Sequence, residues 1–379
     1  MAKPKLALIP STVGGSVYSV LPSNGDGDFD FSRASAATRI NAQGLIETVA
    51  VGDNRLNYPL LDGRVQTCPH LLLEPQRTNL ITRSEDFNNA IWVKENVTIE
   101  SNTETSPDGF LNASYVVPNI GAGLTPRISY PFSSQSSVTY QSSIFVKKFN
   151  TDWIRILSTG ASAATVQAYY NISIGTIGNG GSPDLATIED YGNGWYRLGF
   201  KIFSTNTSSS ATFRVQFAGG DGDSIVTTDG TEKFICWGAQ IEQNSYPTSY
   251  IRTSGSATTR IAEVCNGSGN ASTFNDSEGV LMLQISALAY SVPLQRIALS
   301  DGTGNNRIYI QNSLSNNQIY ISVVSSGVST ADVNNTSYQI TEFNKIAIKY
   351  KVNDFALWIN GTQVATDTSV VTPIGLNEF

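Results

Sequence analysis

The chain has 379 residues, of which 40% are hydrophobic and 15% are charged. At about 150 residues per domain, this length suggests two or three domains, and the hydrophobic content is sufficient for packed cores. The formal net charge is −7, and no run of Lys and Arg is present. A surface that neutralises phosphates is therefore excluded, and we expect no nucleic-acid partner.

The three cysteines, Cys68, Cys236 and Cys265, are widely spaced and form no C-x-x-C pair. This spacing argues against a zinc site and a disulfide framework, so we expect folding in a reducing cytoplasm. No segment approaches about 18 consecutive apolar residues, and residues 6–10 are too few for the apolar region of a signal peptide. We expect neither membrane insertion nor secretion.

Residues 1–80 are predicted to form an irregular N-terminal arm. Gly14-Gly15 and the Asn/Asp/Gly run at residues 24–28 interrupt any sustained apolar periodicity. The leucines at residues 71–73 must then be buried against the next domain or another subunit. We assign this arm to docking and oligomerisation.

Residues 81–264 change to short strands separated by Gly, Asn and Ser. The clearest runs alternate aromatic or β-branched residues with polar ones. They cover residues 140–148, 153–157, 167–174, 195–202, 211–217 and 233–241. Helical crossovers are absent, which favours an antiparallel β-sandwich over a Rossmann or barrel enzyme. Trp195 and Trp237 are predicted core residues.

Residues 265–275 are predicted to be a linker, because small polar residues dominate and no apolar face exists. Residues 276–379 form a third predicted domain, in which Asn360-Gly361 between two apolar runs predicts a β-hairpin. Tyr309, Tyr320 and Trp358 are predicted core residues of this domain. The predicted fold class is all-β: antiparallel β-sandwiches with an irregular N-terminal arm.

One hexapeptide occurs twice, as SAATRI at residues 35–40 and as SATTRI at residues 256–261. The spacing is too long for a solenoid repeat. We expect two similar strands that flank the middle domain, with Arg39 and Arg260 making equivalent contacts.

Several longer segments form a recognisable set. FSRASAATR (residues 31–39), LLEPQRTNL (72–80), NGWYRL (193–198), WGAQIE (237–242) and SYI (249–251) follow one another along the chain, with Phe87 and Trp92 behind the second. Together they resemble a widespread group of phage structural proteins in which this core precedes a concanavalin A-like or laminin-G-like lectin domain. The resemblance covers nearly the whole chain.

The resemblance implies a virion location and, by analogy with phage fibres, a homotrimer. It implies a jelly roll similar to carbohydrate-binding modules at residues 81–264 and a lectin-like sandwich at residues 276–379. The last strands of such a sandwich are missing before Phe379. Either this domain is incomplete, or those strands come from elsewhere. Members of the group are described as tail fibre, head fibre, collar or minor structural proteins.

The sequence lacks the motifs of common catalytic sites. A Ser-His-Asp or Cys-His site needs an imidazole, and the only histidine, His70, is interpreted as an ordinary polar or packed residue. Glycoside hydrolysis requires two acids, and Glu189 with Asp190, or Asp221 with Asp223, stay as alternatives. Because acids in the loops of a β-sandwich usually form turns, we expect no enzymatic activity.

Two kinds of binding site are candidates. Calcium takes several oxygen ligands, so Asp221 and Asp223 form a candidate calcium site, with the Asp/Gly run at residues 25–30 as a weaker one. The alternative is that Asp-Gly only makes turns.

Sugar rings stack on aromatic side chains. The candidate carbohydrate-binding residues are Tyr191, Trp153, Tyr169 and Tyr170.

The sequence therefore predicts a subunit of a phage virion appendage. Its arm would dock on other virion proteins, and its sandwiches would meet a host surface glycan without catalysis. The alternative is a purely architectural head-fibre, collar or tail protein. A glycan depolymerase ranks third.

Overall fold

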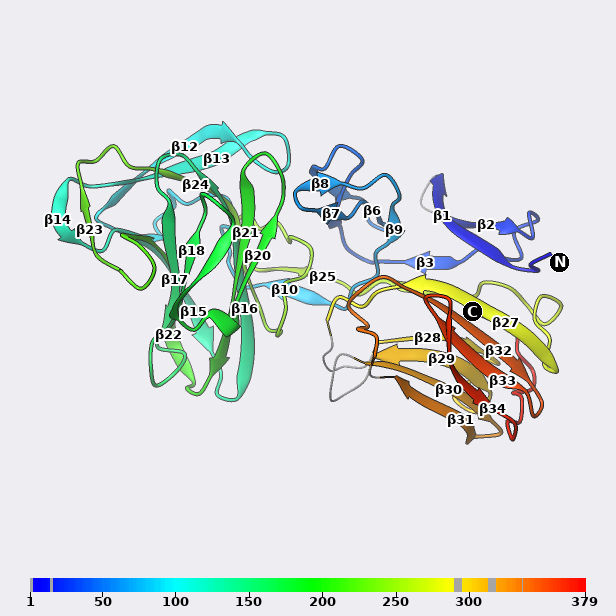
Figure 1. The fold of residues 1–379 in the computed structure, drawn as a ribbon. Helices are drawn as coiled ribbons and strands as arrows, with labels where there is room; N and C mark the ends of the chain where they lie inside the picture. The colour runs from blue at the N-terminus through cyan, green and yellow to red at the C-terminus, as the bar shows by residue number, and fades with distance from the viewer. Residues whose placement is uncertain (1–2, 14–15, 290–294, 313–317, 336) are drawn as a thin grey trace. The chain divides into compact units, whose positions relative to one another are not determined.

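The computed structural model describes residues 3–13, 16–289, 295–312, 318–335 and 337–379 (Figure 1). Within these ranges the chain is all-β, and its sheets are antiparallel, which confirms the predicted fold class. The described residues contain one helix, the 3-10 helix η1 (Pro183–Leu185). No helix in these ranges is long and apolar enough to cross a membrane.

The chain divides into two compact units. The sandwich unit comprises residues 33–263, and the terminal unit comprises residues 1–32 together with residues 264–379. Residues 1–80, which were expected to form one arm, are therefore shared between the two units. Residues 33–80 belong with the middle sandwich, and residues 1–32 belong with the C-terminal residues.

Two six-stranded sheets form the sandwich unit. Sheet I consists, in spatial order, of β11 (Val93–Glu95), β15 (Arg127–Ser134), β22 (Ser208–Ala218), β17 (Trp153–Thr159), β18 (Val166–Asn171) and β19 (Thr176–Gly181). Sheet II consists of β12 (Val97–Thr105), β13 (Leu111–Pro118), β24 (Phe234–Glu242), β16 (Val138–Lys148), β21 (Trp195–Ser204) and β20 (Ala186–Asp190). The strands predicted from alternation are thereby confirmed as β16, β17, β18, β21, β22 and β24.

The main hydrophobic core lies between sheets I and II. Alternate residues of each strand point into it, so β17 contributes Ile154 and Ile156, and β21 contributes Leu198 and Phe200. Three aromatic rings pack together in this core: the ring centroid of Trp92 lies 5.0 Å from those of Phe87 and Tyr130.

A covering layer buries the outer face of sheet II. Phe145, Trp195 and Trp237 on that face pack with Ile46 and Tyr250, which come from outside the sheet. This second layer explains why β24 is buried at every position. Residues of the irregular segment after residue 33 therefore share a hydrophobic core with sheet II. Trp195 and Trp237 are buried, as predicted.

Short strand pairs build the covering layer. They are β4 (Ala37–Ile40) with β5 (Ile46–Val49), β6 (Leu56–Asn57) with β9 (His70–Leu71), β7 (Leu60–Leu61) with β8 (Arg64–Val65), and β10 (Arg77–Asn79) with β25 (Thr258–Arg260). Each pair is too small to be stable alone, so these pairs depend on packing against the rest of the sandwich unit.

The terminal unit is a second sandwich. Sheet III consists of β27 (Glu278–Ile285), β32 (Asn344–Lys351), β33 (Phe355–Ile359) and β34 (Thr362–Asp367), and sheet IV of β28 (Arg296–Ser300), β29 (Arg307–Asn312), β30 (Ile319–Ser325) and β31 (Val328–Asn335). N-terminal residues join it through β3 (Asp30–Ser32), which pairs with β26 (Val264–Asn266).

Asn360 and Gly361 have φ angles of 51° and 85°, which confirms the predicted hairpin.

Tyr309 is buried as predicted, but the core positions expected for Tyr320 and Trp358 were wrong. The neighbours of Tyr309 in β29 point into the core, so its own ring stands on the outer face of sheet IV. There Arg296 and Arg307 cover the ring, with guanidinium carbons 4.4 and 4.7 Å from its centroid. Tyr320 and Trp358 are half-buried on outer faces for the same reason. Alternation indicates that a residue faces one side, but not which side is the core.

Residues 265–275 do not form a free linker. Ser268 is fully buried, exchanges backbone hydrogen bonds with Phe379, and donates its hydroxyl to the carbonyl of Gly27 at 2.6 Å. The Gly27 carbonyl therefore satisfies its buried hydroxyl, and the Phe379 backbone satisfies its backbone groups.

Candidate functional site

Five buried charged residues lie together among the segments that form the covering layer of the sandwich unit. They are Arg33, Arg55, Glu74, Arg260 and Glu263, with side chains 0 or 1% exposed, and we call them the ion network. Glu263 accepts from Arg55 at 2.6 Å and from Arg33 at 3.2 Å. Glu74 accepts from Arg55 at 2.7 Å and lies 3.0 Å from Arg260. These contacts join segments that are distant in sequence.

Three motifs of the sequence meet in the ion network. Arg33 comes from residues 31–39, Glu74 from residues 72–80, and Ser249 from residues 249–251. The backbone N–H and hydroxyl of Ser249 donate to the Glu74 carboxylate at 2.9 and 2.6 Å. The ion network therefore joins segments of these motifs to one another.

The two copies of the repeated hexapeptide are not equivalent. Arg260 lies in β25 and is buried against Glu74. Arg39 lies in β4 and makes a partly exposed pair with Glu47, at side-chain exposures of 26 and 36%. The expectation of equivalent contacts was wrong, because the two strands pair with different partners and occupy different depths.

The charge of Glu74 is set by this network. Burial opposes ionisation of the carboxyl, but Arg260, Arg55 and the two hydrogen bonds from Ser249 outweigh burial and lower its pKa to about 2. Glu74 is therefore an anion at neutral pH.

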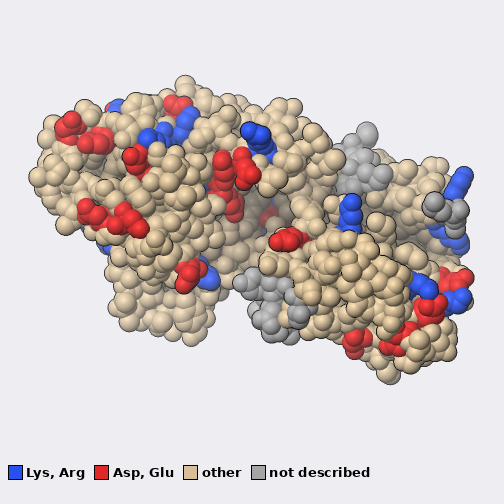
Figure 2. Space-filling model, in the orientation of Figure 1, with Lys and Arg blue, Asp and Glu red and all other residues tan. Residues whose placement is uncertain are grey.

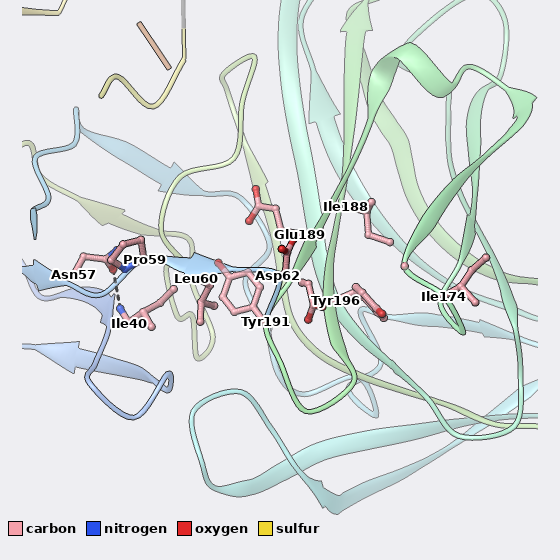
Figure 3. Close-up of a pocket in the computed structure, with 12 residues that line it drawn as sticks. Ile40, Asn57, Pro59, Leu60, Asp62, Ile174, Ile188, Glu189, Tyr191 and Tyr196 are labelled. Carbon is pink, nitrogen blue, oxygen red and sulfur yellow. Dashed lines mark hydrogen bonds between the residues drawn. The ribbon is translucent and has the colours of Figure 1, made fainter. Parts of the chain in front are cut away.

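The candidate functional site is an open groove of about 470 Å³ between the covering layer and one edge of sheet II. One wall comes from the covering layer and the other from β20, β21 and the turn after β18 (Figure 3). The lining residues are Ile40, Asn57, Pro59, Leu60, Asp62, Ile174, Gly175, Ile188, Glu189, Asp190, Tyr191 and Tyr196. Figure 2 shows acidic side chains gathered beside a hollow in this part of the surface.

Two glycines allow the walls to approach each other. A Cβ at Gly63 would lie 2.5 Å from Asp190 Oδ1, and a Cβ at Gly192 would lie 2.5 Å from the Gly63 carbonyl oxygen. Both glycines also have positive φ, 69° and 75°. Side chains at these positions would push the two turns apart, so the shape of the groove depends on their absence.

Tyr191 forms the middle of the groove (Figure 3). Its ring packs edge-on against Phe145 at a centroid distance of 4.8 Å. Burial and the nearby Glu189 carboxylate raise the pKa of Tyr191 to about 12. Asp190 is oriented by the Gly192 N–H, which donates to its Oδ1 at 2.8 Å. The groove thus combines ordered carboxylates with aromatic and aliphatic surface.

The structure separates the four aromatic candidates. Tyr191 lines the groove, whereas Trp153 and Tyr169 lie on the outer face of sheet I, opposite the core residues of β17 and β18. Tyr170 is fully buried in the main core, and its hydroxyl donates to the Gly199 carbonyl at 2.6 Å. Tyr196, which the sequence analysis did not select, lines the groove beside Tyr191.

The acidic candidates Asp221 and Asp223 lie in the loop after β22. Asp221 accepts from the backbone N–H groups of Asn179 and Gly180, both at 2.8 Å, and Asp223 accepts from the N–H of Ile225 at 3.0 Å. Among the described residues no group of three or more acidic, His or Cys side chains is arranged to hold a metal ion. A second hollow, of about 460 Å³, brings Asp223 close to Trp153.

Asp221→Ala is expected to lower the stability of the sandwich unit by about 1 kcal/mol, because two backbone donors of the β18–β19 hairpin lose their acceptor. Thermal unfolding with and without calcium measures this effect. A melting temperature that rises with calcium in the wild type, and not in the variant, would instead assign a calcium ligand to Asp221.

The residues considered for catalysis do not lie at one common site. Glu189 and Asp190 line the groove, whereas His70 lies in β9 and does not. Burial lowers the pKa of His70.

No protein-family model matches this chain, and no curated protein matches it.

Proposed function

We propose that this chain is a non-enzymatic structural subunit of a phage virion appendage whose groove binds a saccharide of the host surface. The observation that carries the saccharide site is the combination of Tyr191 and Tyr196 with the carboxylates of Asp62, Glu189 and Asp190 in one open groove. Small-molecule sites have volumes of about 300 to 1,000 Å³, and the groove falls within this range at about 470 Å³.

Sugar hydroxyls need hydrogen-bond acceptors and donors at fixed positions, and sugar rings also present C–H faces. Carboxylates accept hydrogen bonds from hydroxyl groups. Tyrosine rings supply an apolar face with a polar end, and Ile174, which is 67% exposed, adds aliphatic surface. The groove therefore suits a neutral saccharide, because its acidic residues would repel an anionic one.

The appendage role is supported by the motif set at residues 31–39, 72–80, 193–198, 237–242 and 249–251. In an appendage, the N-terminal residues would contact other virion proteins, and a homotrimer would raise the effective concentration of many weak saccharide contacts. The protein would then be assembled in the host cytoplasm and located in the virion.

Tyr196→Ala is expected to weaken saccharide binding by about tenfold, because the ring contributes apolar contact area in the groove. Asp62→Asn removes one carboxylate in a turn with φ 47° that asparagine also tolerates. The measurement is screening of the full chain on an array of bacterial surface polysaccharides, followed by calorimetry with the strongest ligand. Tyr18→Ala, at a 40% exposed tyrosine of the terminal unit, is the matched control.

The same array separates the alternatives. Absence of any bound polysaccharide would favour a purely architectural role, in which the ion network and covering layer serve assembly only. Release of oligosaccharides from a bound polysaccharide would favour a depolymerase that uses Glu189 and Asp190. We expect binding without release.

A further inference from the structure

The outer face of sheet I differs chemically from the groove. Arg127 of β15 and Arg155 of β17 both lie opposite Gln216 of β22 in the strand register, one on each side. Arg214 lies two residues before Gln216 and therefore shares its face. Because neighbouring strands are about 4.8 Å apart, three arginines lie near one glutamine on this face of the sheet.

One of these three arginines has an ion-pair partner among the described residues. Arg127 pairs with Glu95. Within the described ranges neither Arg155 nor Arg214 forms an ion pair: Arg155 donates to Gln216 and Gln167, and Arg214 donates to Thr212 Oγ1 at 3.0 Å.

Arg155 is also incompletely satisfied. Its Nε is buried and has no hydrogen-bond partner among the described residues. Burial, followed by Arg127 and Arg214, lowers the pKa of Arg155, and burial together with Arg127 lowers that of Arg214. An anion bound between them would relieve this repulsion and satisfy free guanidinium donors.

Aromatic side chains stand beside the arginines. Tyr169 of β18 lies opposite Arg155, with the guanidinium carbon 5.8 Å from the centre of its ring. Trp153 lies two residues before Arg155 on the same face and is half-buried. We call these residues, Arg127, Arg155, Arg214, Gln216, Tyr169 and Trp153, the arginine face.

We propose that the arginine face is a second binding site, separate from the groove, for an acidic polysaccharide. Sugar carboxylates bind the guanidinium groups of Arg155 and Arg214 in the two-pronged geometry that arginine favours, while a sugar ring packs on Trp153. The ligand is a chain of carboxylated sugars and not an isolated anion, because charged and aromatic groups alternate along the face. The acidic groove would exclude this ligand, so the two sites select saccharides of different charge.

The test uses the full chain and polygalacturonate, with the fully methyl-esterified polymer as its uncharged counterpart. Arg155→Gln and Arg214→Gln are each expected to weaken binding of polygalacturonate by about tenfold or more. Lys345→Gln, which removes one exposed charge from the terminal unit, should change binding by less than about twofold. The esterified polymer should not bind, and 300 mM NaCl should weaken binding of the acid form, since screening lengths are then below about 8 Å.

Several results would overturn the proposal. Equal binding of both polymers, or unchanged affinity in both arginine variants with unchanged thermal unfolding, would show that the arginines do not hold carboxylates. If inorganic phosphate bound in an arginine-dependent way and polygalacturonate did not bind, the ligand of the arginine face would be a small anion and not a polysaccharide. Loss of binding in Tyr196→Ala, and not in the arginine variants, would assign the polymer to the groove and leave only the groove as a saccharide site.

Discussion

Glu74→Gln is expected to lower the free energy of unfolding of the sandwich unit by about 3 to 5 kcal/mol, the usual cost of breaking a buried ion pair. The carboxylate lies within 3.0 Å of both Arg55 and Arg260, and its side chain is 1% exposed. A neutral amide would leave these guanidinium groups buried beside too little negative charge. It would also replace one acceptor of the two hydrogen bonds from Ser249.

Denaturant unfolding followed by tryptophan fluorescence measures this loss, because four of the five tryptophans lie within residues 33–263. Glu47→Gln is the matched control. It breaks the partly exposed pair with Arg39, so it should cost no more than about 1 kcal/mol. Equal effects of the two substitutions would show that the ion network does not hold the covering layer.

The stability of the sandwich unit is expected to fall by about 3 kcal/mol between pH 4.5 and pH 2 through Glu74 alone. The folded pKa of Glu74 is about 2, below its ordinary value of 4.5. A lowered carboxyl pKa contributes stability above the unfolded value, and this contribution is lost as the pH falls through the folded one. The unfolded chain takes up the proton first, which favours unfolding.

Two other buried carboxyl groups act in the opposite direction. Burial raises the pKa of Glu85 and of Glu242, so protonation of these two groups favours the folded state as the pH falls. The difference between the wild-type and Glu74→Gln profiles isolates Glu74. We expect this difference to be largest above pH 4.5 and to shrink toward pH 2, whereas a difference independent of pH would refute the lowered pKa.

Much of the fold follows from local sequence patterns. Alternation located β16, β17, β21, β22 and β24, and Asn360-Gly361 located the β33–β34 hairpin. These features depend on side-chain period and on φ preferences, which are properties of a few consecutive residues.

The covering layer and the ion network depend on distant partners. Arg33 and Glu263 are separated by 230 positions, and the Glu74 backbone donates to Glu263 across 189 positions. The periodicity of a short segment cannot predict a contact between residues so far apart in the sequence. Arg33 and Glu74 inside the motif segments were the available signal, since a charged residue that becomes buried needs a partner.

The candidate site was predictable only in part. Tyr191 was selected because it precedes a strand at a turn, and it does line the groove. Tyr196 and Asp62 were missed, because their approach depends on the contact between the turns at Gly63 and Gly192. Tyr170 was selected by composition, yet its position in β18 directs it to the core.

A crystal structure of the full chain with its strongest array ligand tests the central claim most directly. We expect a sugar ring in the groove, in contact with Tyr191 and Tyr196 and within hydrogen-bonding distance of Asp62 or Glu189. A saccharide bound elsewhere on the chain, with the groove empty, would contradict the account.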